Sequence, residues 1–270
     1  MKFDKIGKFS QKPFSINRRL LSDFYDEQGK KHNMIGLVEI DVTKGRAIIA
    51  EIEKKTSIKL SFLGWIAKCV SKAIESHPQV HTMRYKRNKM VTFQDIDISI
   101  MVERKVGEKV IASPKVLRMT NEKTVYELTE EIRNAQSQSI SEQDQFVGKK
   151  RSSRSLKLFL MLPKFIRSRI YQRTLKNPFK VKKDSGTVII TSIGMFAKDK
   201  SAFVIPFGFL PVSIALGSIA KKPGVVNDTI VPREYLHMTI MIDHDIVDGA
   251  PATRFVSEMA ELIEEGYGLE

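Results

Sequence analysis

A histidine near the C-terminus is the side chain whose position best suits catalysis. The run MTIMIDHDIVDGAPATRF, residues 238–255, begins as an alternating strand, delivers His244 into a turn, and ends that turn with Asp248-Gly249 ahead of a helix. A neutral imidazole has an unperturbed pKa of about 6.5, so it can accept a proton near neutral pH and later return it. We therefore expect His244 to act as a general base. From spacing alone, a surface or core histidine without a catalytic role is the alternative.

The carboxylates around this histidine could mimic a metal site. Asp243, Asp245 and Asp248 have the right side-chain types, but a second histidine at ligand spacing is missing, because His237 lies seven residues upstream. Catalytic zinc sites need nitrogen or sulfur ligands at such spacing. We therefore expect no metal.

A second polar cluster lies in the run GTVIITSIGMF, residues 186–196. Thr191 and Ser192 come just before Gly194, but the lysine of a phosphate-binding loop does not follow. Nucleoside triphosphate binding therefore has no support. The plain interpretation is a strand that leads into a turn and whose hydroxyls are satisfied.

Strands and helices that do not alternate strictly must position these residues. Strands are expected at 33–43, as two short pieces about a turn at Asn88 within 81–93, at 95–104, at 109–119 with an interruption at Pro114, and at 185–194, 201–207, 212–220 and 235–243. Helices are expected at 16–28, 44–56, 62–77, 120–135 and 249–266, with two short ones about Pro163. This order predicts one mixed-sheet α/β or α+β domain over residues 1–270, with flanking helices and a basic amphipathic insertion at about 140–184.

Composition agrees with one globular domain. The chain has 270 residues, of which 42% are hydrophobic. The single cysteine, Cys69, lies in an apolar helical pattern, so we expect a buried reduced thiol. The N-terminus lacks the apolar core of a signal peptide, and no run approaches the roughly 20 apolar residues of a membrane span. These features predict a cytoplasmic protein.

The net charge of +14 comes almost entirely from one segment. Between Gly148 and Asp184 there are thirteen basic residues and no acidic one, which leaves +1 for the rest of the chain. The cations of residues 149–183 alternate with Leu, Phe, Ile and Tyr. One interpretation is a helix at an anionic membrane surface, which would make the protein peripheral to the membrane. A second is a hairpin that covers its own sheet or a neighbouring subunit. Nucleic acid is the third, although no recognised binding module accompanies the charge.

The two motifs together resemble those of the 2-oxoacid dehydrogenase acyltransferases, a family related to chloramphenicol acetyltransferase. The family carries a His-x-x-x-Asp-Gly motif, found here from His244 to Asp248-Gly249. Upstream it has a Gly-Thr-strand-hydroxyl-x-x-Gly-Met-Phe segment, found here at 186–196. The runs VEIDVT, FQDIDISIMV and PVSIALGSIAKKP resemble further family elements. The resemblance covers roughly residues 15–135 and 185–268. It implies a chloramphenicol acetyltransferase-like fold.

The resemblance also implies roles for single residues. His244 would be the general base toward the thiol of coenzyme A or toward the thiol or hydroxyl of the acceptor. Thr191, at a position usually held by serine, would donate a hydrogen bond to the oxyanion, with Ser192 as the fallback. Asp248 would form a structural ion pair with an N-terminal arginine, for which Arg18 and Arg19 are both candidates.

The same resemblance implies partners. Family members are trimers whose active sites lie between subunits, so a homotrimer that uses acyl-coenzyme A is expected. Three features differ from a dehydrogenase-complex enzyme. Only about fifteen residues precede the first matched helix and no lipoyl-type Asp-Lys-Ala site occurs. Asp245 stands where arginine is usual, and the basic connection is long. We expect a free-standing acyltransferase, the alternative being a non-catalytic trimeric scaffold or interaction protein of the same fold.

Overall fold

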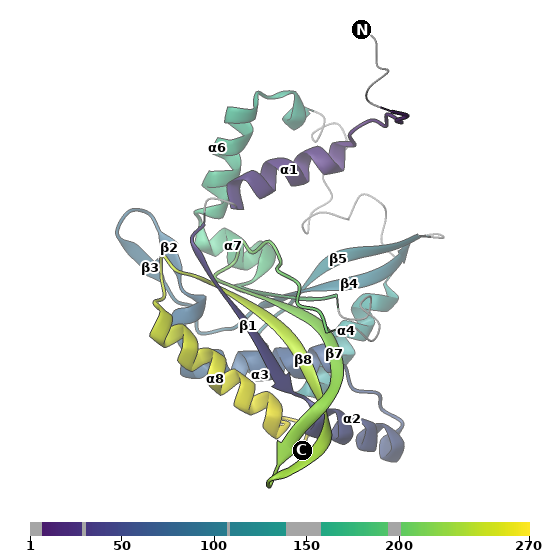
Figure 1. Ribbon diagram of the computed structural model, residues 1–270. Helices are drawn as coiled ribbons and strands as arrows, with labels where there is room; N and C mark the ends of the chain where they lie inside the picture. The colour runs from purple at the N-terminus through teal and green to yellow at the C-terminus, as the bar shows by residue number, and fades with distance from the viewer. Residues whose placement is uncertain (1–6, 29–30, 107–108, 139–157, 194–200) are drawn as a thin grey trace.

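The computed structural model describes the chain except for residues 1–6, 29–30, 107–108, 139–157 and 194–200. A six-stranded sheet in the order β1-β8-β7-β6-β4-β5 forms its centre (Figure 1). Its strands are β1 (Asn33–Asp41), β4 (Ile98–Val106), β5 (Lys109–Leu117), β6 (Val188–Ser192), β7 (Val212–Val226) and β8 (Thr229–Asp243). A separate hairpin pairs β2 (Met83–Tyr85) with β3 (Lys89–Val91).

The sheet is mixed, as the sequence predicted. Strand β6 runs parallel to both β4 and β7, whereas the β1–β8, β7–β8 and β4–β5 pairs are antiparallel. The helices are α1 (Ile16–Gln28), α2 (Thr43–Thr56), α3 (Phe62–Ser76), α4 (Val125–Ser137), α6 (Lys164–Leu175), α7 (Pro178–Ser185) and α8 (Gly249–Glu265), with a 3₁₀ turn η1 (Pro78–His81). Among the described residues, no helix is both long and apolar enough to cross a membrane.

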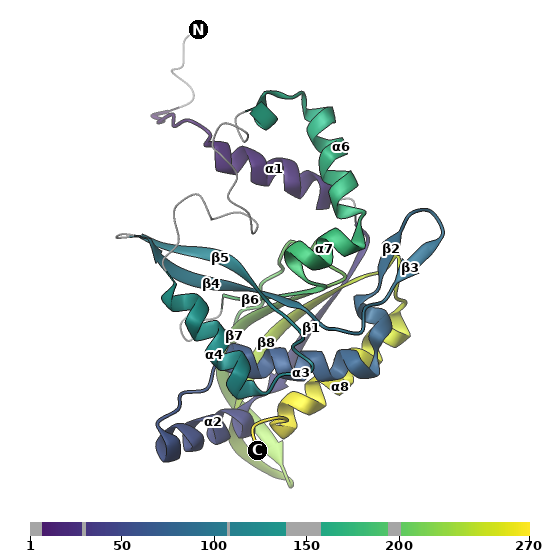
Figure 2. The same cartoon turned by 180° about the vertical axis from the view of Figure 1, so that it is seen from behind.

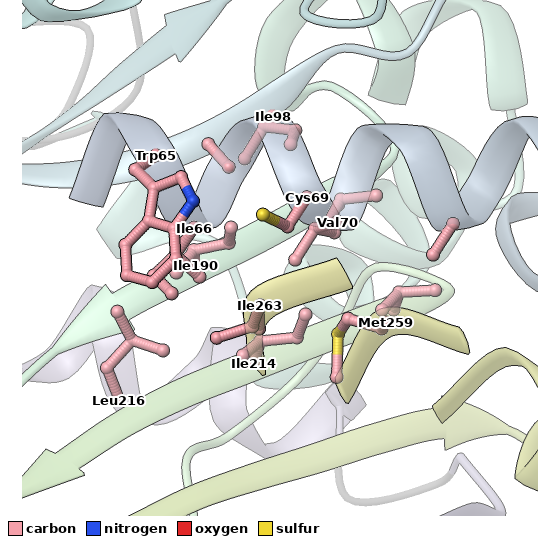
Figure 3. Packing of buried hydrophobic residues seen from close by; sticks show 14 of the residues in the cluster. Trp65, Ile66, Cys69, Val70, Ile98, Ile190, Ile214, Leu216, Met259 and Ile263 are labelled. Atoms are coloured by element: carbon pink, nitrogen blue, oxygen red, sulfur yellow. The ribbon is translucent and has the colours of Figure 1, made fainter. Parts of the chain in front are cut away.

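Helix α3 is the centre of the hydrophobic core. Ser61 caps its N-terminus by accepting a hydrogen bond from the Gly64 N–H at 3.2 Å, and apolar residues at helical spacing then face the sheet and α8. Figure 3 shows Trp65 and Cys69 close to sheet and α8 side chains such as Ile190 and Met259. Cys69 is buried and reduced, which confirms the prediction. Burial raises the pKa of its thiol to about 12, so the thiolate nucleophile is suppressed.

The long β7–β8 hairpin carries the histidine. Its turn is formed by Asn227 and Asp228, whose φ angles of 48° and 59° lie in the left-handed region that asparagine and aspartate tolerate. Both strands extend beyond the predicted 212–220 and 235–243, because the second half of the hairpin is a two-stranded ribbon whose pairing the apolar pattern does not reveal.

Two strand predictions were wrong. Residues 201–207 are irregular, because the backbone of this apolar run meets the β7 bulge at Ala202, whose N–H donates to Ser218 Oγ and whose carbonyl accepts from the Ser218 N–H. The predicted interruption at Pro114 is also absent. Strand β5 is an edge strand, so the N–H that proline lacks need not pair.

The basic segment divides in two within its described part. Residues 158–161 form a helical turn, Pro163 precedes α6, and α7 is an additional helix that the sequence analysis missed. Helix α7 packs on the sheet side through Pro178 and Val181, whereas α6 packs on α1. Figures 1 and 2 show the α1–α6 pair at one end of the molecule, beyond α7 and away from α2, α3 and α8.

Candidate active site

His244 lies in a turn that is tied down on both sides. The Asp243 N–H donates to the Pro211 carbonyl at 3.0 Å, and the His244 N–H donates to the His32 carbonyl at 2.7 Å. The Asp243 carbonyl in turn accepts from the Val247 N–H at 3.1 Å, and Val247 is buried in the core. The imidazole remains accessible, with 48% of the side chain exposed. The backbone on both sides of His244 is therefore hydrogen-bonded, and about half of the imidazole side chain faces solvent.

The acidic neighbours of His244 are matched by basic groups just before β1. Lys31 Nζ lies 2.8 Å from Asp243 Oδ2, and His32 Nδ1 lies 2.9 Å from Asp245 Oδ1. The hydrogen bond to Asp245 raises the pKa of His32. Asp245, which replaces the family's usual arginine, thus has a partner of its own. Sequence reasoning missed Lys31 and His32, because only the β1–β8 register brings residues 213 positions apart together.

Asp248 is loosely held. Its side chain is 92% exposed, and its Oδ1 atom lies 4.0 Å from His244 Nδ1, too far for a hydrogen bond. It occupies the N-cap of α8 without a side-chain capping bond, and an added Cβ at Gly249 would meet no atom within 4 Å. In the described part of this single chain, the structure does not bring Asp248 together with Arg18 or Arg19, and its carboxylate lies closer to the His244 ring instead.

Thr191 and Ser192 end β6 and point to opposite sides of the sheet. Thr191 is in register with Ala215, and Ser192 is in register with Leu216, which belongs to the helix-covered core. Thr191 therefore lies on the face away from α3, which makes it the better candidate for a site outside the core. Gly194, Met195 and Phe196 of the predicted motif lie outside the described residues.

The start of the same motif has a structural role. Gly186 has φ +75°, and an added Cβ would collide with the Asp97 carbonyl, so this position requires glycine. The next residue, Thr187, is buried, and its Oγ1 lies 3.1 Å from His81 Nδ1. Burial lowers the pKa of His81 to about 4, which keeps the ring neutral. Gly186 and Thr187 thus hold the start of β6 against Asp97, which precedes β4, and against His81 of η1.

His244 and Thr191 are far apart within one chain. Ile242 pairs with Val212, which pairs with Val188. His244 lies two residues beyond Ile242 in one direction, and Thr191 lies three residues beyond Val188 in the other. At about 3.3 Å per residue, the two positions differ by about 16 Å along the strands and by two strand spacings of about 4.8 Å. A single chain therefore does not bring the imidazole and the hydroxyl together.

Comparison with known proteins identifies the family. A model of the 2-oxoacid dehydrogenases acyltransferase (catalytic domain) family matches residues 27–145 and 169–269, which is most of the chain. The chain belongs to this family. The match leaves out residues 146–168, the first half of the basic segment, and also nearly all of α1. The His244 turn and β6 both lie inside the matched part of the acyltransferase domain.

Individual relatives agree with the acyltransferase assignment. The probable dihydrolipoyllysine-residue succinyltransferase component of the mitochondrial 2-oxoglutarate dehydrogenase complex of Schizosaccharomyces pombe is 27% identical over 80% of this chain. The match spans 40% of that relative's length. A solved dihydrolipoamide acetyltransferase of Azotobacter vinelandii has a TM-score of 0.69 at 14% identity, covering 100% of this chain and 97% of that one. A chloramphenicol acetyltransferase has a TM-score of 0.50 at 12% identity, covering 94% and 100%. These two likenesses confirm the predicted fold.

The described residues contain no group of three or more histidine, cysteine, aspartate or glutamate side chains that could hold a metal ion. Around His244, the described residues place an exposed imidazole on a hydrogen-bonded turn, next to two carboxylates that have basic partners. This arrangement suits proton transfer to and from a bound thiol or hydroxyl.

Proposed function

We propose that this chain is an acyltransferase that moves an acyl group between coenzyme A and a thiol or hydroxyl acceptor. The observation that carries the proposal is His244, an accessible imidazole held by two backbone hydrogen bonds inside the matched family domain. The A. vinelandii structure comes from a study of a serine, a histidine and an asparagine in the catalytic mechanism of that enzyme, the last two spaced by four positions. His244 and Asp248 have the same spacing.

The proposed reaction needs only one base and one hydrogen-bond donor. A ring nitrogen of His244 accepts the proton of the acceptor's S–H or O–H, and the freed sulfur or oxygen attacks the thioester carbonyl. The Thr191 hydroxyl donates to the resulting oxyanion, and losing such a donor typically costs about 3 to 4 kcal/mol of transition-state stabilisation. The intermediate then expels the coenzyme A thiolate, which recovers the proton from the imidazolium.

The separation of the two residues within one chain supports a shared site. We infer a homotrimer in which His244 of one subunit faces Thr191 of its neighbour, because an intrachain distance of this size excludes direct cooperation. Light scattering on the purified chain tests the assembly. Mixing inactive His244→Ala and inactive Thr191→Ala chains tests the sharing, since mixed trimers would regain part of the activity. Activity that stays absent in verified mixed trimers would contradict a shared site.

Thiol release from a panel of acyl-coenzyme A esters tests the activity itself. His244→Ala should lower the rate by about a hundred- to ten-thousand-fold. His77→Gln removes a histidine that pairs with Glu258 outside the site, and this control should keep the rate. Equal rates in wild type and His244→Ala would remove the catalytic proposal and favour the alternative, a non-catalytic trimeric scaffold or interaction protein. The exposed position of Asp248, which has no lysine or arginine partner in the described part of the chain, is the observation that favours that alternative.

A further inference from the structure

Helix α6 has a charged residue inside and apolar residues outside. Arg167 is only 9% exposed, whereas Phe165 is 73% exposed and Met161, in the preceding turn, is 80% exposed. Burial of Phe165 and Met161 would stabilise the fold, while burial of an ion pair gives little net stabilisation. An ordinary amphipathic helix buries its apolar face and exposes its charged face. Helix α6 does the opposite, and this orientation requires an explanation.

Helix α1 holds α6 in that orientation. The Arg167 guanidinium donates from Nε to Asp23 Oδ2 at 2.7 Å and from Nη2 to Asp23 Oδ1 at 3.1 Å. Ser168 donates to Glu27, and Lys164 Nζ lies 2.7 Å from Asp26 Oδ2. These contacts match the acidic face of α1 to the inner face of α6. The outer face of α6 is consequently a fixed surface.

That outer face combines an apolar tip with a row of cations. Leu158, Met161 and Phe165 are the exposed apolar residues, and we name them together with Arg169, Arg173 and Lys176 the α6 surface. The three cations line an open hollow of about 340 Å³ with Gln172. Within the described part of the chain, no carboxylate forms an ion pair with Arg169, Arg173 or Lys176.

Three other described cations of the basic segment, Lys164, Arg167 and Lys182, do have carboxylate partners. Lys182 Nζ lies 2.7 Å from Asp97 Oδ2 and attaches α7 to the sheet, just as Arg167 and Lys164 attach α6 to α1. A hairpin covering its own sheet therefore accounts for α7 but not for the α6 surface. Figures 1 and 2 show α6 at the end of the molecule beyond α7, where it packs along α1.

We propose that the α6 surface binds an anionic phospholipid bilayer, with Leu158, Met161 and Phe165 in the acyl boundary and Arg169, Arg173 and Lys176 on the headgroup phosphates. Exposed apolar side chains next to unpaired cations fit this partner, because the apolar groups leave water while the cations gain counter-charges. A nucleic acid would use the cations but would leave an aliphatic tip such as Leu158 and Met161 in water. Stable attachment requires both signals, since a single one gives marginal binding.

Vesicle flotation with the full-length protein tests the proposal. Vesicles of phosphatidylcholine alone should leave the protein in solution, whereas an equal mixture of phosphatidylcholine and phosphatidylglycerol should carry it upward, with binding that weakens as salt is raised. The variant Arg169→Gln/Arg173→Gln/Lys176→Gln should bind the mixed vesicles on the order of a hundredfold more weakly, about fivefold for each cation. The variant Met161→Ala/Phe165→Ala should also lose most of the binding.

Matched controls separate the α6 surface from overall charge and hydrophobicity. Lys44→Gln/Lys54→Gln/Lys89→Gln removes three exposed lysines elsewhere, and Val225→Ala/Ile230→Ala removes two exposed apolar residues from the β7–β8 hairpin; both should bind as wild type does. Equal losses in the controls and in the α6 variants would overturn the proposal. Binding to a single-stranded oligonucleotide that is tighter than vesicle binding and indifferent to Met161→Ala/Phe165→Ala would overturn it as well.

The result is independent of catalysis. His244→Ala should float with the mixed vesicles as wild type does, because the turn that carries His244 is separate from the α6 surface. A protein that floats but does not turn over would keep this proposal while removing the catalytic one. A protein that catalyses the reaction but does not float would keep the catalytic proposal and remove the membrane proposal.

Discussion

Helices α3 and α6 differ in the kind of residue that each buries. Nine of the fifteen residues of α3 are buried, and all but Ser71 are apolar or glycine. Helix α6 buries one residue, the cation Arg167, and it is held by α1 through ion pairs and through rings such as Phe24 and Tyr171, whose centroids are 6.1 Å apart. The difference indicates that α3 builds the fold, whereas the α1–α6 pair is a peripheral unit whose outer face carries exposed apolar side chains such as Phe165.

The largest effect is expected in the α3 region. Trp65→Ala should lower the free energy of unfolding by about 3 to 5 kcal/mol, because it empties a fully buried site and breaks the hydrogen bond from Trp65 Nε1 to the Tyr267 carbonyl at 3.1 Å. Urea unfolding measures the change. A loss below about 1 kcal/mol would mean that α3 does not carry the core.

Acid should lower the free energy of unfolding of the protein through the titration of His81. Burial lowers the pKa of His81 to about 4, against about 6.5 in the unfolded chain. As the pH falls from 6.5 to 4 the unfolded chain gains a proton that the folded chain does not, so stability is lost in this window, by up to about 3 kcal/mol. His81→Gln should remove that part of the pH dependence. Identical slopes in wild type and variant would contradict the assignment.

A smaller and local effect is expected at the α1–α6 contact. Asp23→Asn leaves the Arg167 guanidinium without its carboxylate, which should lower the opening free energy of α6 by about 1 to 3 kcal/mol. Hydrogen exchange should show faster exchange in α6 and unchanged protection in α3. Equal loss of protection in both helices would show that the pair is part of the core after all.

The smallest effect on stability is expected on the outer face of α6. Phe165→Ala should change the free energy of unfolding by no more than about 0.5 kcal/mol, because the ring is mostly in water. Trp65→Ala is the natural comparison in the same urea experiment. A loss approaching that of Trp65 would show that Phe165 packs within the protein, and the α6 surface would then have no free apolar tip.

Local sequence patterns predicted many elements because their causes are local. The apolar spacing in 62–77 and the alternation in 95–104 depend on residues a few positions apart, and the helix and the strand that they predict are both present. The strand predicted at 201–207 was wrong, because apolar alternation alone does not show whether a neighbouring strand is free to pair. The predicted interruption at Pro114 was wrong, because a proline disturbs strand pairing only where its missing N–H would face a partner strand.

The candidate site divides in the same way. His244 and Thr191 could be singled out from the sequence because a base after a strand and a hydroxyl at a strand end are local features, to which the family resemblance added roles. The sequence could not predict that Asp245 contacts His32, or that His244 and Thr191 are far apart within one chain. Both features depend on which strands pair and in what register.

The sequence by itself determined the types of most elements, the mixed fold, the catalytic histidine as a hypothesis and the position of the excess charge. Only the tertiary structure decided that Arg167 turns inward onto Asp23, that Phe165 turns outward, and that Asp248 has no arginine partner within the described part of the chain. The physical reason is the separation along the chain of the residues that interact. Periodicity and turn preference are energies of neighbouring residues, whereas burial and ion pairing join residues as far apart as Asp23 and Arg167, which are 144 positions apart in the chain.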